Sequence, residues 1–210
     1  MSLHILLADD HPIVRQGLKL LLEREGFTVV GEASDGREAV RLAQELCPDI
    51  VLLDLTMPLL NGIDTGRAIR QTSPKTKIIL LTMHAEDHHV LEALRAGIKG
   101  YVLKTKASEE LVQAIQEVSR GSLYLTPGVS EAVVQAYLAK TEVPPEPLSR
   151  REREVLQLVA EGKTTKEVGV VLGISTKTAE SHRTRIMAKL NIHETASLVR
   201  YAIRRGLVQP

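Results

Sequence analysis

The chain has 210 residues, of which 43% are hydrophobic and 25% are charged, as in folded globular proteins with room for two domains. No apolar stretch approaches the ~20 residues of a membrane-spanning helix, and the N-terminal residues lack the pattern of a signal peptide. The single cysteine excludes an intrachain disulfide. These features predict a cytoplasmic location and no membrane partner.

Charge is distributed unevenly along the chain. Residues 1–147 carry 15 Lys and Arg against 20 Asp and Glu, a net charge of −5, whereas residues 148–210 carry 12 against 6, a net charge of +6. A small basic segment attached to an acidic one favours a nucleic-acid-binding module with a separate control domain. A solvated basic surface would give the same count, so charge alone does not decide between the two.

Strand and helix patterns alternate five times in the first 120 residues. Apolar runs predict buried parallel strands over residues 4–8, 28–33, 49–54, 77–82 and 100–103. Helical patterns cover residues 12–25, 36–47, 62–72, 86–96 and 107–120. Candidate helix caps are Gly26, Gly97, Gly121, Asp35 and Ser108. The alternation predicts a flavodoxin-like, doubly wound α/β domain with a five-stranded parallel sheet.

The pattern changes after Gly121. A short helix is expected at 129–140, and the prolines of residues 144–147 then form a short, semi-rigid linker. Further on, only helical patterns occur, near 149–160, 165–172, 176–190 and 194–205. The expected organisation is therefore a domain at 1–121, a linker at 122–147, and an all-α domain of four helices at 148–210.

Polar side chains follow four of the five predicted strands. Asp9 and Asp10 close the first strand, Asp54 the third and Thr82 the fourth, and Lys104 follows the fifth. In a doubly wound sheet the carboxyl ends of the strands border one crevice, so we expect these groups to converge. Three carboxylates in one place repel one another, and a hard cation such as Mg²⁺ relieves that repulsion with oxygen ligands.

This set of residue types indicates a metal-assisted phosphoacceptor site. Asp9, Asp10 and Asp54 would be ligands of Mg²⁺, together with the backbone carbonyl of Thr56. Asp54 would attack phosphorus, Lys104 would balance the phosphoryl charge, and the hydroxyl at the end of the fourth strand would donate to a phosphoryl oxygen. For any single residue, a strand-end acid or a helix cap is the simpler explanation. A phosphatase with an aspartate nucleophile is the alternative for the set, but no second acid is spaced to act as general acid.

The seven histidines form no metal-ligand pattern in the sequence. His11, directly after the acidic pair, is interpreted as a residue that begins a helix, with a possible influence on that pair.

Residues 3–120 resemble the receiver domain of bacterial two-component response regulators, because they share its Asp9-Asp10 pair, Asp54, Met57-Pro58, Thr82 and Lys104. The resemblance implies that Asp54 takes a phosphoryl group from a partner histidine kinase. It also implies that Thr82 moves toward that group while Tyr101 turns inward.

Two positions depart from the receiver pattern. Thr105 follows Lys104 where many receivers have proline and a cis peptide, which leaves the isomer of this bond open. Met83 follows Thr82 where a small residue is common, and its bulk would restrict entry to the site.

The C-terminal segment carries a helix-turn-helix pattern, with helices at 165–172 and 176–190 joined by a turn at Gly173–Ser175. The second helix has polar residues on one face, as a recognition helix has. The expected DNA contacts are Thr165, Lys166, Lys177, Glu180, Ser181, Thr184, Arg185 and Lys189. A charged, solvated helix face is the simpler alternative.

Residues 148–208 look like a LuxR-type DNA-binding domain, which places the chain among response regulators of the NarL/FixJ class. Such a regulator is cytoplasmic, is phosphorylated by a histidine kinase in an Mg²⁺-dependent step, and binds double-stranded promoter DNA as a homodimer when phosphorylated. It is no enzyme apart from its own phosphoryl transfer and dephosphorylation. The alternative is a phosphorylation-independent regulator whose receiver is a docking platform. Leu198, Tyr201 and Ala202 are a candidate contact between two copies, although core packing explains Leu198 equally well.

Overall fold

The computed structural model of the protein describes residues 2–83, 87–129 and 147–208. The chain divides into two compact units, Met1–Thr141 and Glu142–Pro210. In the described ranges no helix combines the length and the apolar character that crossing a membrane requires. Most of the expected helix at 129–140 and of the proline-rich linker lies outside the described residues.

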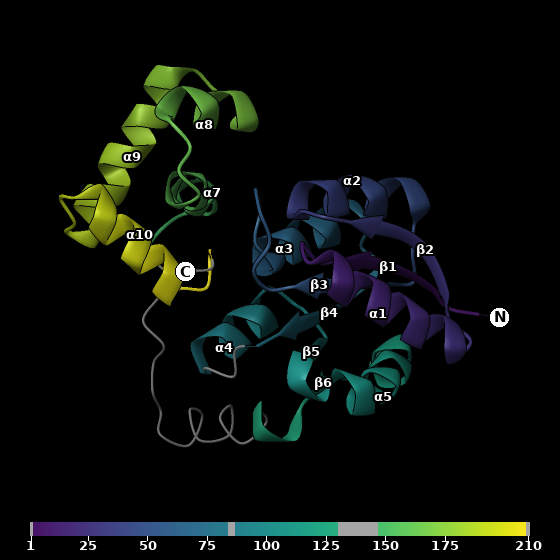
Figure 1. Ribbon diagram of the computed structural model, residues 1–210. Coiled ribbons are helices and arrows are strands. Elements are labelled where there is room, and N and C mark those ends of the chain that lie inside the picture. Colours follow the sequence, from purple (N-terminus) through teal and green to yellow (C-terminus); the bar gives the residue numbers. More distant parts are fainter. Residues whose placement is uncertain (1, 84–86, 130–146, 209–210) are drawn as a thin grey trace. The chain divides into compact units, whose positions relative to one another are not determined.

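The N-terminal unit is built on a parallel sheet (Figure 1). Its strands are β1 (His4–Ala8), β2 (Thr28–Ala33), β3 (Ile50–Asp54), β4 (Lys77–Thr82), β5 (Gly100–Leu103) and β6 (Tyr124–Leu125). Their order is β2-β1-β3-β4-β5-β6, and every neighbouring pair is parallel. The predicted parallel α/β fold is confirmed, but the sheet has six strands and not five. The sixth strand lies in the segment that we expected to be linker, so the sheet continues past residue 121.

Helices cover both faces of this sheet (Figure 1). They are α1 (Pro12–Arg24), α2 (Gly36–Leu46), α3 (Gly62–Thr72), α4 (Asp87–Arg95) and α5 (Ala107–Ser119). On one face, Leu22 of α1 and Ile115 of α5 pack in a core with the sheet. On the other face, residues of the remaining three helices, such as Ala43, Ile69 and Val90, form a second core. Because both faces are covered, the inner strands are apolar between their end residues, and polar residues stand only at the strand ends.

Of the two N-caps expected for these helices, one is present and one is not. The side chain of Asp35 accepts hydrogen bonds from the backbone N–H groups of Arg37 and Glu38, which confirms it as the N-cap of α2. Ser108 is not an N-cap, because a 3-10 turn at Lys104–Lys106 leads directly into α5, which already begins at Ala107.

The C-terminal unit consists of α7 (Arg150–Ala160), α8 (Thr165–Leu172), α9 (Thr176–Leu190) and α10 (Thr195–Arg204) (Figure 1). The prediction of four helices is confirmed in the described residues. Ser149 with Glu152 and Thr164 with Glu167 form capping boxes at the starts of α7 and α8. Gly173 ends α8 with a φ of 64° and forms the turn into α9.

Two residues of α10 that we expected at a contact between copies are buried. Leu198 and Ala202 are buried, at 1% and 0% exposure, and α10 packs against α7 of the same unit. Our interpretation of these two residues as a contact between copies is therefore wrong. Tyr201 is half-buried, and the guanidinium of Arg205 lies 5.7 Å from its ring centroid.

Candidate functional site

Four side chains that we expected at one crevice stand at the carboxyl ends of adjacent strands. Asp9 follows β1, Asp54 ends β3, Thr82 ends β4 and Lys104 follows β5, and these four strands are consecutive in the sheet. Nζ of Lys104 lies 2.8 Å from Oδ2 of Asp9 and 3.0 Å from Oδ2 of Asp54. The ammonium group thus joins two carboxylates from strands that are distant in sequence.

The side chains of Asp9 and Asp54 are held away from water, whereas that of Asp10 is partly exposed. Asp54 is only 4% exposed, and its burial is the main reason why its pKa rises to about 6. The Lys104 ammonium opposes this rise in the pKa, whereas Asp9 and Asp10 add to it. Burial by itself would lower the pKa of Lys104, but the neighbouring Asp54 and Asp9 carboxylates raise it overall. The crevice therefore holds more negative charge than one lysine compensates.

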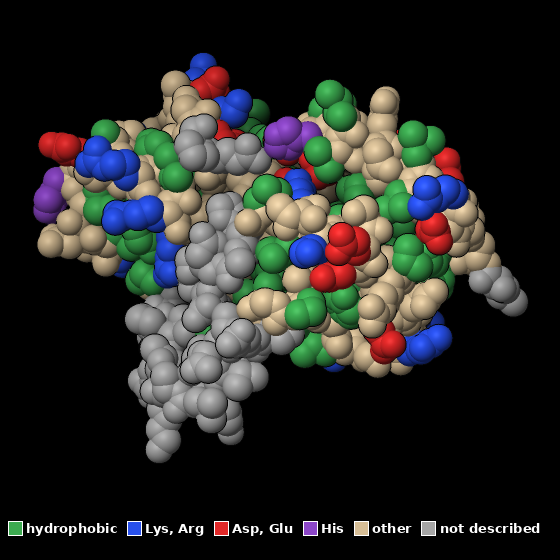
Figure 2. Space-filling view, turned by 60° about the horizontal axis from the view of Figure 1, so that its bottom comes forward, with side chains coloured by type: hydrophobic (Ala, Val, Ile, Leu, Met, Phe, Trp, Pro, Cys, Tyr) green, Lys and Arg blue, Asp and Glu red, His purple; other side chains and the backbone are tan. Residues whose placement is uncertain are grey.

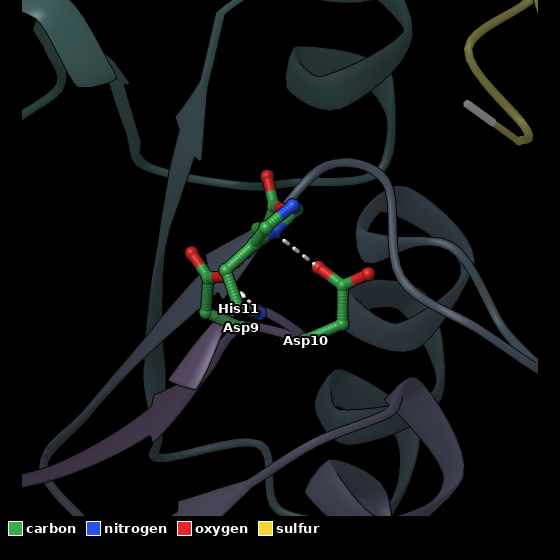
Figure 3. A group of neighbouring side chains, drawn as sticks. Asp9, Asp10 and His11 are labelled. Atoms are coloured by element: carbon green, nitrogen blue, oxygen red, sulfur yellow. Dashed lines mark hydrogen bonds and ion pairs between the residues drawn. The ribbon is translucent and has the colours of Figure 1, made fainter. Parts of the chain in front are cut away.

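Asp10 and His11 border the same crevice (Figure 3). Nδ1 of His11 lies 2.8 Å from Oδ1 of Asp10 and 3.4 Å from Oδ1 of Asp9. The backbone N–H of His11 donates to Oδ1 of Asp9 over 2.8 Å. One possible ligand atom from each of Asp9, Asp10, His11 and Asp54 lies within 4.8 Å of the other three. We did not expect His11 among the possible metal ligands, and its position next to the acidic pair is the one feature of the sequence that pointed to it.

The chain after Asp54 is fixed by close backbone contacts. Thr56, whose carbonyl we expected to bind the cation, is buried in this loop. A Cβ atom at Gly62 would lie 2.1 Å from the carbonyl oxygen of Asp54, and one at Gly36 would lie 2.0 Å from that of Leu60. The backbone of the loop therefore approaches two helix starts so closely that only glycine fits there. The role of the Thr56 carbonyl remains a prediction.

Thr82 and Tyr101 are buried on neighbouring strands, at 0% and 1% exposure. Asp54 pairs with Leu81, so Thr82 stands one residue beyond the level of Asp54 along the next strand. Tyr101 pairs with Leu80, which lies two residues before Thr82, so the two side chains share one face of the sheet. Tyr101 belongs to the core on that face, and its ring is therefore inward in this structure.

The structure also describes the two departures from the receiver pattern. The peptide bond between Lys104 and Thr105 is trans. The side chain of Met83 is largely exposed, at 65%, so it lies at the surface beyond the buried Thr82.

The expected DNA-binding residues of α9 lie on its exposed face. Ala179 and Ile186 of this helix are buried in the unit. The exposed residues on the other side are Lys177, Glu180, Ser181, Thr184 and Arg185. Lys166 at the start of α8 is exposed, and Thr165 beside it is half-buried. Figure 2 shows several Lys and Arg side chains on the visible face of this unit.

Lys189, the last residue of the expected DNA contacts, has a partner inside the unit. Its Nζ lies 2.7 Å from Oε2 of Glu152, whose side chain is 5% exposed. Burial raises the pKa of Glu152, but Lys189 and Ser149 outweigh it, and the pKa is lowered overall. This ion pair connects α9 to α7, which gives Lys189 a role in holding α9 in place within the unit.

Two family models match the chain. Residues 5–116 match the response regulator receiver domain, and residues 146–202 match the bacterial regulatory proteins of the luxR family. The chain therefore belongs to the two-component response regulators of the NarL/FixJ class, with a LuxR-type helix-turn-helix domain. It is a DNA-binding transcriptional regulator of that class.

The chain aligns with known response regulators over nearly their whole length. The chain is 41% identical over 209 residues to the transcriptional regulatory protein LiaR of Bacillus subtilis, covering 98% of this chain and 99% of LiaR. It is 38% identical over 208 residues to the response regulator UvrY of Escherichia coli, and the alignment covers 98% of this chain and 95% of UvrY. Among solved structures, RcsB from Salmonella enterica serovar Typhimurium, bound to promoter rprA in the presence of phosphomimetic BeF3−, is 30% identical with a TM-score of 0.66, covering 96% of this chain and 98% of that chain.

Proposed function

We propose that Asp54 is the phosphoacceptor of this regulator and that Mg²⁺ is required for its phosphorylation by a histidine kinase. The observation that carries the proposal is the pair of contacts from Lys104 to Asp9 and Asp54 at the carboxyl ends of adjacent strands. An oxygen of Asp54 forms the new bond to phosphorus, and the bond from phosphorus to the kinase histidine breaks. Lys104 would bind a phosphoryl oxygen and balance the negative charge that the phosphoryl group brings to Asp54.

The residues of the crevice fit a divalent cation. Oδ1 of Asp10 and Oδ2 of Asp54 are buried and accept no hydrogen bond, although each lies within ion-pair distance of His11 or Lys104. Buried carboxylate oxygens without hydrogen bonds are costly, and a cation satisfies them. Asp9, Asp10 and Asp54 would hold Mg²⁺ with the Thr56 carbonyl. When bound, it would supply a positive charge close to the transferring phosphoryl group.

The test is intact-mass analysis of the full chain after incubation with a small phosphodonor. We expect one phosphoryl adduct on wild type in the presence of Mg²⁺, none after chelation, and none on Asp54→Asn. Asp35→Asn is a matched control, because Asp35 caps α2 outside the crevice and its removal should leave the adduct intact. Equal labelling of wild type and Asp54→Asn would contradict the proposal, whereas the absence of any adduct on wild type would favour the phosphorylation-independent regulator.

We infer further that the regulator binds promoter DNA as a homodimer after phosphorylation, through the exposed face of α9. A two-fold dimer presents two such helices to half-sites about one turn of DNA apart. Thr82 and Tyr101 would carry the change from Asp54 to the receiver surface, because they share one face of the sheet. Light scattering and DNA binding of one sample, with and without phosphodonor, should show dimer formation and tighter binding together. Tighter binding by an unchanged monomer would contradict this inference.

A further inference from the structure

We propose that Arg151 of α7 is a positioning residue that orients α9 for sequence-specific DNA binding, on the basis that α9 contacts DNA as proposed above. The guanidinium of Arg151 makes two hydrogen bonds in different directions. Nη2 donates to the backbone carbonyl of Leu172, the last residue of α8, over 2.6 Å. Nη1 donates to Oε2 of Glu154, three residues further along α7, over 2.7 Å. Arg151 thus joins α7 to the end of the helix that precedes α9.

The carbonyl of Leu172 lies directly before the turn that leads into α9. The last carbonyl groups of a helix have no partner within the helix, and they carry its negative partial charge. A guanidinium bound there therefore stabilises the end of α8 by hydrogen bonding and by charge. Only Gly173, Ile174 and Ser175 separate this carbonyl from Thr176, where α9 begins.

The turn between α8 and α9 is closely packed. Gly173 has a φ of 64°, and the N–H of Ile174 donates to the carbonyl of Gly169 over 2.9 Å. A Cβ atom at Gly169 would lie 2.9 Å from the carbonyl oxygen of Ile174, so the turn lies directly against α8. Ser175 then caps α9 by accepting a hydrogen bond from the N–H of Thr178. Because these bonds hold the turn in one conformation, a contact that fixes the end of α8 also positions the first turn of α9.

Two consecutive residues of α7 hold α9 from its two ends. Arg151 holds the turn before α9, and Glu152 binds Nζ of Lys189 near the C-terminal end of α9. The expected base contacts Glu180 and Ser181 lie between these two points and are exposed. The pair of contacts therefore fixes the orientation of the face that is proposed to meet DNA.

Glu154 directs the guanidinium of Arg151. The carboxylate of Glu154 is shared, because it also accepts a hydrogen bond from Nε of Arg150 over 3.1 Å. A guanidinium is planar and holds its donors at fixed angles, so a bond from one nitrogen to Glu154 aims the other nitrogen at Leu172. Lysine is a point charge on a flexible stem and imposes no such direction. The geometry of arginine is therefore needed here in addition to its charge.

Loss of the bond from Arg151 should weaken base contacts more than phosphate contacts. Hydrogen bonds to base edges need donor–acceptor distances of about 3 Å and nearly linear angles, so a small rotation of α9 breaks them. Contacts of lysine with phosphates are mainly electrostatic, and their energy falls slowly with distance. Arg151 therefore contributes to the preference for one DNA sequence over another through α9 and not through a contact of its own with DNA.

The test compares the affinity of the full chain for two duplexes of equal length by fluorescence anisotropy at several salt concentrations. One duplex has the sequence recovered by binding-site selection with wild type, and the other has a random sequence. We expect Arg151→Met to lower the affinity for the selected duplex by about tenfold, as the loss of one base contact does, and for the random duplex by less than about twofold. The slope of log affinity against log salt should stay unchanged.

Two variants accompany Arg151→Met. Arg150→Met is the matched control, because it removes the same charge and the other arginine on Glu154 but leaves the bond to the Leu172 carbonyl. It should not change the ratio of the two affinities. Arg151→Lys keeps the charge, and we expect it to lower the ratio in the same direction as Arg151→Met. Circular dichroism shows whether each variant is folded, and if Arg151→Met is not, Arg151→Lys decides the question.

Three results would overturn the inference. An equal loss of affinity for both duplexes would show only a general effect on the fold. A slope reduced by about 1 in Arg151→Met would make Arg151 a phosphate contact. A wild-type ratio in Arg151→Lys would show that charge alone is sufficient.

Lys177→Ala, measured in the same titrations, tests the DNA contact of α9 separately. If its slope is reduced while Arg151→Met keeps the wild-type ratio, the proposed contact of α9 stands and the role of Arg151 is refuted. An unchanged slope for Lys177→Ala would contradict the proposed contact face, and the role of Arg151 with it.

Discussion

Asp54→Asn should stabilise the N-terminal unit in the absence of divalent cations. The carboxylate of Asp54 is buried beside Asp9 and Asp10, and Lys104 compensates only part of the charge. Asparagine keeps the volume of the side chain and resembles the protonated acid, so it removes the cost of holding a charge in this crevice. A substitution in the proposed acceptor is therefore expected to raise the free energy of unfolding.

The size and the pH dependence of this effect follow from the pKa of Asp54. Its pKa is raised from 3.8 to about 6 in the folded protein, which corresponds to about 3 kcal/mol. Because an acid with a raised pKa binds its proton more tightly when folded, wild type loses this stability as the pH rises from about 4 to about 6. The increase in the free energy of unfolding caused by Asp54→Asn should therefore be close to zero near pH 4. It should grow between about pH 4 and about pH 6 and stay constant at higher pH.

Hydrogen exchange followed by mass spectrometry measures this effect in the full chain, with peptides from β3 and β4 reporting on the N-terminal unit. Asp35→Asn is the control, because it removes the same charge from the same unit while asparagine still caps α2. Added Mg²⁺ should reduce the difference in the free energy of unfolding between variant and wild type, because it binds the folded wild type more strongly than the variant. A variant less stable than wild type at pH 8 would refute the reasoning, because the charge of Asp54 would then be stabilising.

Three further predictions concern the C-terminal unit. Lys166→Ala or Lys177→Ala should weaken binding to all DNA sequences alike and reduce the slope of log affinity against log salt by about 1, as titrations at several salt concentrations will show; an unchanged slope would remove that lysine from the phosphate contacts. Glu180→Ala should change the preferred base at one position in a binding-site selection, and identical preferences would contradict the assigned face of α9. Lys189→Met should lower the stability of the unit by about 2 kcal/mol in denaturant titrations, because buried Glu152 loses its partner 2.7 Å away. A loss of DNA affinity without any loss of stability would instead make Lys189 a DNA contact.

The fold could be predicted where a segment's own residues decide its structure. The residues of β3 are all buried, and their apolar run has no alternative explanation in a domain of alternating strands and helices. The strand β6 was missed because two residues, Tyr124–Leu125, are too few for a periodic pattern. Their strand character comes from parallel pairing with β5, which no local pattern contains. The expectation that Ser108 caps α5 is wrong for a similar reason, because the local sequence does not indicate the 3-10 turn at Lys104–Lys106 that precedes the helix.

The candidate site shows the same division between local and tertiary information. Asp9 and Asp54 could be placed together because parallel strands all end at one edge of the sheet. The contact of His11 with Asp10 depends on the orientation of one ring, which sequence does not determine. The pair Lys189–Glu152 joins residues 37 positions apart on two helices, and only the packing of α9 on α7 brings them together.

The order of strands in the sheet has a consequence for how the protein is made on the ribosome. β1 is synthesised first and lies inside the sheet, with β2 on one side and β3, β4, β5 and β6 on the other in the order of their synthesis. Each strand therefore finds its neighbour already in place when it emerges, and the sheet can grow outward from β1 without rearrangement. Until β6 has been synthesised, however, one edge of β5 has unpaired backbone N–H and C=O groups. During this interval the nascent chain can pair with other chains through that edge and aggregate.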